Sequence, residues 1–386
     1  MEPKRITILG STGSIGRSAL DVVVAHPGRF KVIALAAGRK VEILADQITR
    51  FRPRLAVVYS ESEAEQLRRI SPLNGLEIAF GQEGLQKAAS LAENEVVLNA
   101  LVGAAGLLAS LETVKAGKNL ALANKESLVV GGSLFAKEAE KSGAKILPVD
   151  SEHSAIWQCL TAGKMNEIRR IILTASGGPF RELPKENFKD ITPEQALAHP
   201  TWKMGPKVTI DSATMMNKGL ELIEAVWLFS MTPDNIKIVI HPQSVVHSMV
   251  EYVDSSVIAQ MSFPDMRLPI AYALFWPDRR PSDYGRLDLA QVGQLTFLEP
   301  DEDKFPALRL ARQAAALGGT APAALNAANE VAVQSFLDGA IGFLQIPELI
   351  EKTLVKHTVI TTPSLEDILD ADREARRLTA EQIGTG

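Results

Sequence analysis

The sequence predicts an α/β protein with a parallel N-terminal sheet, a central α/β domain whose sheet is largely antiparallel and carries a flap, and a small α-helical C-terminal domain. Three observations support this prediction. β-Branched runs alternate with helical patterns up to residue 150, candidate strands cluster between residues 151 and 277, and helical spacing of Ala, Leu and Arg returns after residue 307. The alternation is typical of a parallel sheet, because each parallel pair needs a crossover.

Short apolar runs predict the strands of the N-terminal sheet. They lie at residues 6–9, 32–35, 56–59, 76–79, 96–98, 120–123 and 146–149. The central strands are predicted at residues 170–174, 207–210, 236–240, 245–252 and 257–262.

Residues 180–206 interrupt the central domain with a stretch that is rich in proline and charge. Long irregular segments of this kind are often lids or binding loops, so we expect a flap here. The predicted divisions are residues 1–150, 151–277 with the flap, a linker at 278–306, and 307–386.

Composition excludes several classes of protein. The 386 residues are 46% apolar and 23% charged, which is ordinary for a globular chain. A net charge of −5 provides no general basic field for nucleic acid or anionic lipid. The longest stretch without charged residues, 313–329, is interrupted by Pro322. We therefore predict no nucleic-acid partner and no membrane span.

The single cysteine, Cys159, cannot form an internal disulfide or a cysteine-based zinc site. This fits a reducing cytoplasm. The N-terminus leads directly into a strand-like run, so we expect a cytoplasmic protein unless a targeting segment has been removed. Any metal ion would need oxygen or histidine ligands.

A glycine-rich turn follows the first predicted strand. Gly10, Gly13 and Gly16 precede and open a helix, an arrangement that lets a backbone approach a pyrophosphate at the helix N-terminus. The alternative is a merely tight turn. The strand before it, the helix after it and the further β/α units favour a Rossmann-like dinucleotide-binding domain.

The next strand end indicates the type of dinucleotide. A NAD site needs a carboxylate for the ribose 2′-hydroxyl, but Gly38, Arg39 and Lys40 stand here, and the first acid is Glu42. A solvated basic helix start is the alternative. We predict NADPH.

Carboxylates suited to a divalent cation follow the last strand of this domain. Asp150 and Glu152 leave the strand two residues apart, although Asp-Ser-Glu is also a good helix N-cap. A third acid, Glu221, lies on one helical face with Lys218.

Three sets of donors suit a phosphate group: the Ser176-Gly177-Gly178 turn, then Ser212, then Asn217 with Lys218. His199 lies in the predicted flap, where an isolated histidine is often only solvated. Lys125 and Glu126 border the carboxyl end of the sixth strand, where surface decoration is the alternative.

These motifs together resemble the 1-deoxy-D-xylulose 5-phosphate reductoisomerase family over essentially the whole chain. The resemblance rests on the glycine turn, Leu122-Ala-Asn-Lys-Glu-Ser127, Pro148-Val-Asp-Ser-Glu-His153, Ser176-Gly-Gly-Pro-Phe180, His199-Pro-x-Trp202, Asp211-Ser-Ala-Thr-Met-Met-Asn-Lys-Gly-Leu-Glu221 and Ala324-Leu-Asn-Ala-Ala-Asn-Glu330.

The resemblance implies an activity. The family rearranges and reduces 1-deoxy-D-xylulose 5-phosphate to 2-C-methyl-D-erythritol 4-phosphate, a step of the non-mevalonate route to isoprenoid precursors. It uses NADPH and Mg²⁺, Mn²⁺ or Co²⁺, and its members are usually homodimers.

The resemblance also implies residue roles. Metal ligands would be Asp150, Glu152 and Glu221, which with Lys125 and His199 form the catalytic set. The substrate phosphate would lie on Ser176, Ser212, Asn217 and Lys218. The rest of the substrate would meet Lys125, Ser151, Glu152, His199 and Glu221, with Trp202 and Met204 capping it. NADPH would contact Thr12, Gly13, Ser14, Ile15, Gly38, Arg39, Lys40, Asn124, Glu126 and Gly205.

Two other functions compete with this one. A semialdehyde dehydrogenase has a similar domain order, but it needs a nucleophilic cysteine, and Cys159 lies in an apolar run. An NADP-sensing module would bind the nucleotide without chemistry, but it has no use for three metal-suited acids.

Overall fold

The computed structural model describes residues 2–70, 75–200, 202 and 204–384. The chain divides into two compact units. The first unit comprises Met1–Ser127, Leu134–Ser154 and Asp265–Gly285, and the second comprises Leu128–Ser133, Ala155–Pro264 and Arg286–Gly386. Within the described ranges, none of the helices combines the length and apolar character that crossing a bilayer requires.

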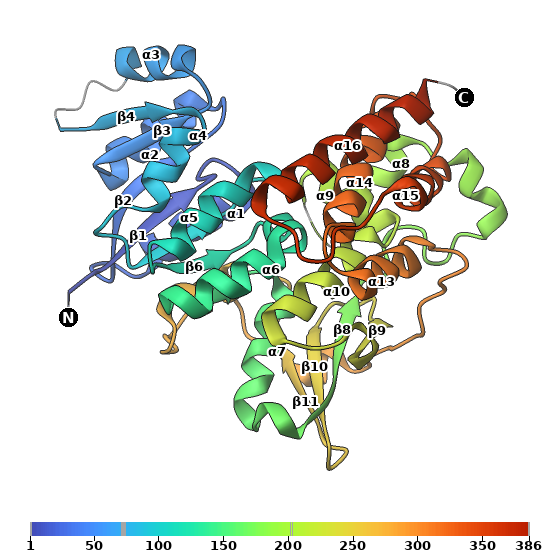
Figure 1. The fold of residues 1–386 in the computed structure, drawn as a ribbon. Coiled ribbons are helices and arrows are strands. Elements are labelled where there is room, and N and C mark those ends of the chain that lie inside the picture. Colours follow the sequence, from blue (N-terminus) through green and yellow to red (C-terminus); the bar gives the residue numbers. More distant parts are fainter. Residues whose placement is uncertain (1, 71–74, 201, 203, 385–386) are drawn as a thin grey trace. The chain divides into compact units, whose positions relative to one another are not determined.

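The first unit is built on a seven-stranded sheet in the order β4-β3-β2-β1-β5-β6-β7, and all neighbours pair in parallel (Figure 1). Its strands are β1 (Lys4–Leu9), β2 (Phe30–Ala36), β3 (Leu55–Val58), β4 (Glu77–Phe80), β5 (Val96–Asn99), β6 (Asn119–Leu122) and β7 (Ile146–Pro148). The predicted parallel sheet and its strands are confirmed. The strand order reverses beside β1, and ligands of such sheets bind at the carboxyl ends of the strands there.

Helices cover both faces of this sheet. They are α1 (Ser14–Ala25), α2 (Val41–Phe51), α3 (Glu61–Ile70), α4 (Gly81–Ala89), α5 (Leu107–Lys115), α6 (Lys125–Ser142) and the start of α7 (Ser151–Cys159). A short 3₁₀ turn, η1 (Gly103–Gly106), precedes α5. The core is mainly aliphatic, and Ile6, Ile8 and Leu35 in it are fully buried.

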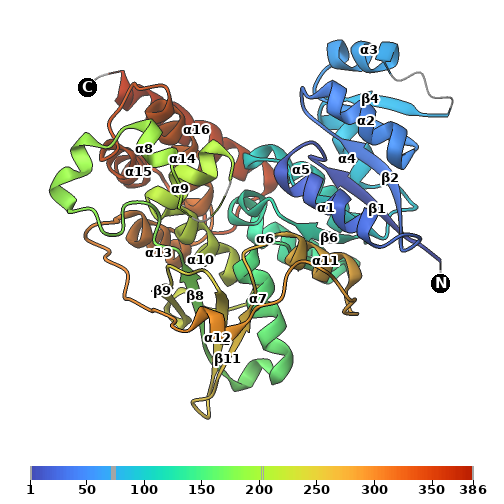
Figure 2. The same ribbon diagram turned by 180° about the vertical axis from the view of Figure 1, so that it is seen from behind.

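Helix α11 (Arg267–Phe275) packs against α1 in the first unit (Figure 2). His26 joins the two helices, because its ring meets the Phe275 ring edge-on at 4.7 Å. Sequence reasoning assigns residues 265–277 to the central domain, whereas their contacts here are with the first unit. The four-part division of the chain stays a prediction.

The second unit holds a four-stranded sheet in the order β11-β10-β8-β9. The strands are β8 (Ile168–Ala175), β9 (Ile236–Ile240), β10 (Val246–Tyr252) and β11 (Val257–Met261). Strand β10 pairs antiparallel with β8 and β11, and β8 pairs parallel with β9, so the largely antiparallel sheet is confirmed.

The strand predicted at residues 207–210 is wrong. Residues Pro206–Ala213 form helix α9. Pro206 stands at the first helical position, where it suits a helix start, and Lys207 pairs with Asp211 one turn later at 2.6 Å. These helix signals outweigh the β-branched character of Val208, Thr209 and Ile210.

Helices complete the second unit. The C-terminal region is helical as predicted, with α13 (Ala307–Leu317), α14 (Ala321–Leu337), α15 (Gln345–Lys356) and α16 (Leu365–Ile383). These helices share one apolar core with α10 (Met216–Phe229) and with the face of the sheet. The predicted linker contains only α12 (Leu289–Val292) and a bridge between Leu298 and Ile240. The remaining 3₁₀ turns are η2 (Leu160–Ala162), η3 (Met165–Glu167) and η5 (Pro233–Asn235).

The first part of the predicted flap is packed into this core. It holds η4 (Lys185–Asp190) and α8 (Pro193–Leu197), and Phe188 is buried against Phe305 and Phe343. The flap at residues 180–206 stays a prediction, and its residues 201 and 203 lie outside the described residues.

Candidate active site

The glycine turn of the first unit is a tight loop between β1 and α1. Gly10 has φ +84°, and a Cβ on it would lie 2.5 Å from the Ala100 carbonyl oxygen. A Cβ on Gly16 would lie 2.3 Å from the Gly10 oxygen. Both positions therefore require glycine, because the loop and the first turn of the helix pack on each other.

Helix α1 offers unoccupied backbone donors at its N-terminus. Its N-cap is Gly13, no side chain caps it, and its first turn contains no acidic residue. Gly13 and Ser14 are exposed, whereas Thr12 is buried. A helix start of this kind favours a bound anion, because its amides lack partners and the helix dipole is positive there.

The carboxyl end of β2 carries two exposed cations. Arg39 and Lys40 precede helix α2, and among the described residues no carboxylate lies within ion-pair distance of either. The Arg39 guanidinium lies over the ring of Tyr59, with its carbon 4.9 Å from the ring centroid.

Asn124 fixes the loop after β6. Its side-chain amide donates to the Gly103 carbonyl and to the Glu126 carboxylate, both at 2.9 Å, and only 1% of the residue is exposed. Asn99, at the end of β5, similarly donates to Gly106 and Ser110. Sequence reasoning missed Asn99, although an asparagine at the carboxyl end of a central strand was an available signal.

Lys125 and Asp150 form an ion pair in the first unit, at the carboxyl ends of β6 and β7. Both are largely buried. The Ser151 hydroxyl donates to the Glu152 carboxylate at 2.5 Å. The structure thus brings together four predicted residues that follow adjacent strands.

In the second unit, the loop after β8 packs against helix α9. Gly177 and Gly178 both have positive φ, at +84° and +66°. A Cβ on Gly178 would lie 2.5 Å from the Ser212 carbonyl oxygen. The predicted Ser176 and Ser212 donor segments are therefore neighbours, and glycine is what allows their close approach.

His199 joins this group through both ring nitrogens. Its Nδ1 accepts the backbone N–H of Trp202 at 2.9 Å, so the proton of the neutral ring lies on Nε2, 3.2 Å from the Ser176 hydroxyl oxygen. Burial lowers the pKa of His199. The neutral ring is therefore the form that this geometry holds.

Helix α10 carries the remaining predicted residues of the second unit. Its N-cap, Met215, has φ +64°, which ends α9 and redirects the chain. The Asn217 amide donates to Glu221 Oε1 at 2.5 Å, and Lys218 Nζ is paired with Glu221 Oε2. Lys218 and Glu221 are 4% and 1% exposed, so this is a buried, charge-compensated cluster.

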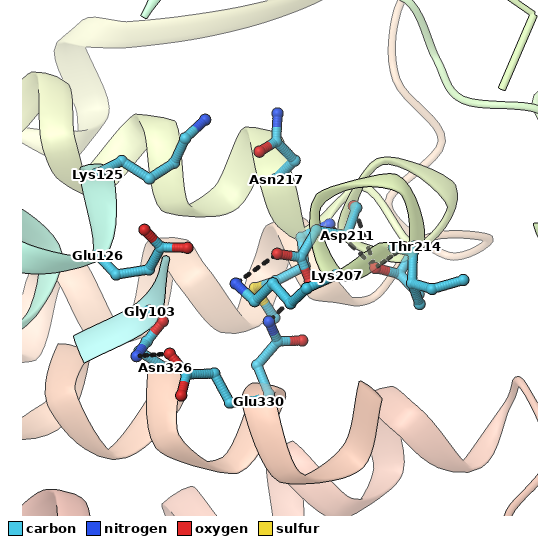
Figure 3. Close-up of polar contacts among 12 residues, drawn as sticks. Gly103, Lys125, Glu126, Lys207, Asp211, Thr214, Asn217, Asn326 and Glu330 are labelled. Atoms are coloured by element: carbon cyan, nitrogen blue, oxygen red, sulfur yellow. Dashed lines mark hydrogen bonds and ion pairs between the residues drawn. The ribbon is translucent and has the colours of Figure 1, made fainter. Parts of the chain in front are cut away.

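Asp211, one residue before Ser212, is a buried anchor that sequence reasoning did not assign. Its carboxylate pairs with Lys207 at 2.6 Å and accepts the Asn329 amide at 2.8 Å (Figure 3). On the same helix α14, Asn326 donates to Glu330 at 3.0 Å, and Glu330 pairs with Arg376 of α16 at 2.6 Å. The C-terminal helices therefore hold α9 in place.

Known proteins resemble this chain over nearly its whole length. Family models for 1-deoxy-D-xylulose 5-phosphate reductoisomerase match residues 6–132, and models for its C-terminal domains match residues 146–229 and 261–378. The chain is 54% identical to the reductoisomerase of Chlorobium limicola over 99% of its own length and 100% of the relative's. It is 52% identical to that of Pseudomonas putida, over 99% and 97%.

The chain belongs to the 1-deoxy-D-xylulose 5-phosphate reductoisomerase family.

Solved members of the reductoisomerase family share the fold. The enzyme from Zymomonas mobilis in complex with NADPH superimposes with a TM-score of 0.93 at 46% identity, and 99% of each chain is covered. A family structure in complex with NADPH, fosmidomycin and magnesium gives 0.93 at 43% identity, covering 99% of this chain and 98% of that one. Family membership makes this chain an oxidoreductase.

Proposed function

We propose that this chain converts 1-deoxy-D-xylulose 5-phosphate to 2-C-methyl-D-erythritol 4-phosphate, with NADPH and Mg²⁺, Mn²⁺ or Co²⁺, in the non-mevalonate route to isoprenoid precursors. The observation that carries the proposal is the cluster of the buried Lys218 and Glu221 with the half-buried Asn217, next to the segment that holds Ser212. Relatives that share this fold bind NADPH, magnesium and fosmidomycin.

NADPH binds to the first unit in this proposal. The free amides at the start of α1 suit its pyrophosphate, and Arg39 and Lys40 suit its 2′-phosphate. The cofactor supplies the hydride for the reduction. The contacting residues are Thr12, Gly13, Ser14, Ile15, Gly38, Arg39, Lys40, Asn124 and Glu126 from the first unit, with Gly205 from the second.

Asp150, Glu152 and Glu221 hold the divalent cation. Carboxylate oxygens are the ligands that Mg²⁺ and Mn²⁺ prefer. Within their own units, Asp150 is paired with Lys125 and Glu221 with Lys218, so each charge is compensated when no metal ion is bound. When bound, a divalent cation supplies polarisation of the ketose carbonyl.

The second unit binds the substrate phosphate. Ser176, Ser212, Asn217 and Lys218 donate to its oxygens. Lys218 is then shared between the phosphate and Glu221, and the neutral His199 donates through Nε2. Lys125 and Ser151 contact the rest of the sugar. Trp202 and Met204 of the predicted flap, residues 180–206, cover the sugar as its apolar contacts, which excludes water.

The properties of Cys159 argue against the semialdehyde dehydrogenase alternative. Burial raises the pKa of its thiol to about 11, and only 2% of the residue is exposed. An acyl-transfer cysteine needs the opposite, a lowered pKa and access to substrate.

The proposal also includes a homodimer in the cytoplasm. Strand β11 is an edge strand, and its Val257 and Ile258 are 47% and 38% exposed. Natural proteins usually cover such an apolar edge, and pairing with a second copy would do so. The lone cysteine agrees with a reducing compartment.

One assay tests the reaction. NADPH oxidation should require both 1-deoxy-D-xylulose 5-phosphate and a divalent cation, and EDTA should abolish it. In a manganese titration, Glu221→Gln should weaken binding on the order of tenfold or more, since even loss of an outer-shell partner costs that much. The matched control Glu182→Gln removes a carboxylate that is 84% exposed and should change nothing. A chain that binds NADPH but no metal ion would support the sensor instead.

A further inference from the structure

An exposed tyrosine stands beside the predicted 2′-phosphate site. Strands β2 and β3 are neighbours, with Ala36 opposite Val57, and the Ala37 N–H donates to the Val57 carbonyl at 2.9 Å. The residues that follow the two strands therefore leave the sheet side by side. Tyr59 follows β3 directly and is 60% exposed.

The tyrosine ring lies under the Arg39 guanidinium. The guanidinium carbon is 4.9 Å from the ring centroid, within the range of a cation–π contact. A cation–π contact uses the charge of the guanidinium and not its hydrogen bonds, so N–H groups that point away from the ring stay available for two oxygens of a phosphate group. A contact of this kind also limits the rotamers of a long, exposed side chain before any ligand arrives.

An acid on the following helix that feels the charge of Arg39 is already engaged. Glu63, in the first turn of α3, is hydrogen-bonded by the Ser60 hydroxyl, and this bond, more than Arg39, lowers the pKa of its carboxyl group. Among the described residues, Arg39 has no carboxylate within ion-pair distance. Its charge is therefore available for an anionic ligand.

We propose that Tyr59 is a positioning residue for cofactor choice: it holds Arg39 with the N–H edge of the guanidinium presented to the 2′-phosphate of NADPH. This inference rests on the proposed function, since it needs NADPH to be the cofactor. Tyr59 then acts through Arg39 and makes no contribution to an adenine nucleotide that lacks the 2′-phosphate.

Calorimetric titration with two probes separates these effects. Adenosine 2′,5′-bisphosphate and adenosine 5′-monophosphate differ only in the 2′-phosphate. Tyr59→Leu keeps an apolar side chain without the aromatic face, so it should weaken binding of the bisphosphate about two- to fivefold and leave the monophosphate unchanged. Tyr59→Phe keeps the face and should bind both probes as the wild type does.

A double-mutant cycle shows whether Arg39 transmits the effect. In an Arg39→Met background, Tyr59→Leu should cause no further loss. Equal loss for both probes would place the ring against the adenine, and loss in Tyr59→Phe would assign the effect to the hydroxyl; either result, or no loss in Tyr59→Leu, overturns the inference.

The proposed function has a separate test in the same experiment. If Arg39→Met together with Lys40→Met leaves the preference for the bisphosphate intact, the 2′-phosphate assignment itself fails. If that preference disappears while Tyr59→Leu has no effect, only the role of Tyr59 is wrong.

Discussion

The candidate ligand sites of the two units are built differently: the first from backbone groups, the second from side chains. In the first unit, the candidate nucleotide site is a backbone surface, in which Gly10 and Gly16 are needed for shape and the amides of α1 are left free. In the second unit, the candidate phosphate site consists of side chains: the half-buried His199 contacts Ser176, and Lys218 and Glu221 are buried and paired with each other. A backbone site depends on local steric fit, whereas a side-chain site depends on distant packing.

The two candidate sites also differ in how far apart their residues lie along the sequence. The nucleotide turn is complete within residues 10–16. The proposed phosphate site draws on residues 176–178, His199 and residues 211–221, and Asp211 is bonded to Asn329, which is 118 residues away. The first site should therefore be damaged by one added methyl group, and the second by loss of a remote partner.

The largest effect is expected from Gly16→Ala. The added Cβ would lie 2.3 Å from the Gly10 oxygen and 2.5 Å from the Ser11 Cα, both backbone atoms that cannot move cheaply. We expect the free energy of unfolding to fall by about 3 kcal/mol and NADPH binding to be lost. Gly38→Ala is the control for stability, because its Cβ would meet nothing within 4 Å. Equal denaturation midpoints for the two variants would contradict the steric explanation.

In the second unit, Asp211→Asn should lower stability and weaken the candidate phosphate site by removing a contact with a distant helix. The carboxylate is 1% exposed and is shared by Lys207 and Asn329, so neutralising it should cost about 2 kcal/mol of stability. Because Ser212 follows directly, KM for the substrate should rise more than kcat falls. The exposed Asp303→Asn is the matched control. A variant that loses stability while KM stays constant would show that Asp211 does not position Ser212.

A smaller, pH-dependent effect is expected at His199. Burial lowers the pKa of its ring, so the folded protein resists protonation that the unfolded chain accepts near pH 6.5. The stability due to the neutral ring is therefore present above that pH and is lost as the pH falls below it. Protonation would also set an N–H on Nδ1 against the Trp202 N–H.

KM measured against pH tests this expectation. The substrate phosphate titrates near pH 6, so it makes its own contribution to the change of KM at acid pH. His199→Asn keeps an acceptor near the Nδ1 position but does not titrate, so its KM should be a few-fold higher and its acid limb shallower than that of the wild type. Identical limbs in the two proteins would exclude His199 as the titrating group.

The same contrast explains what the sequence could predict. The strands of the first sheet are continuous apolar runs, and glycine spacing specifies the nucleotide turn, so both were found from local signals. The strand prediction for residues 207–210 was wrong because Val208, Thr209 and Ile210 favour a strand. The helix there is set instead by Pro206 and the Lys207–Asp211 pair.

Contacts between distant segments could not be predicted in this way. Nothing near Asp211 indicates Asn329 as its partner, and nothing near residue 267 indicates packing on α1. The half of the predicted flap that contains Phe188 is polar and proline-rich in sequence, yet two phenylalanines, Phe180 and Phe188, anchor it among aromatic rings.

The smallest effect is expected at Cys159, which lies in the core of the second unit and takes no part in either site. Its thiol is 2% exposed, and burial raises its pKa to about 11, so almost no thiolate is present at neutral pH. Iodoacetamide should leave the folded protein unmodified over a period in which it labels the urea-unfolded chain completely. Cys159→Ala removes one buried sulfur and should cost about 1 kcal/mol of stability with kcat unchanged. Rapid labelling of the folded protein, or loss of turnover in the alanine variant at unchanged stability, would indicate that Cys159 takes part in the reaction. The acyl-transfer alternative would then need a new test.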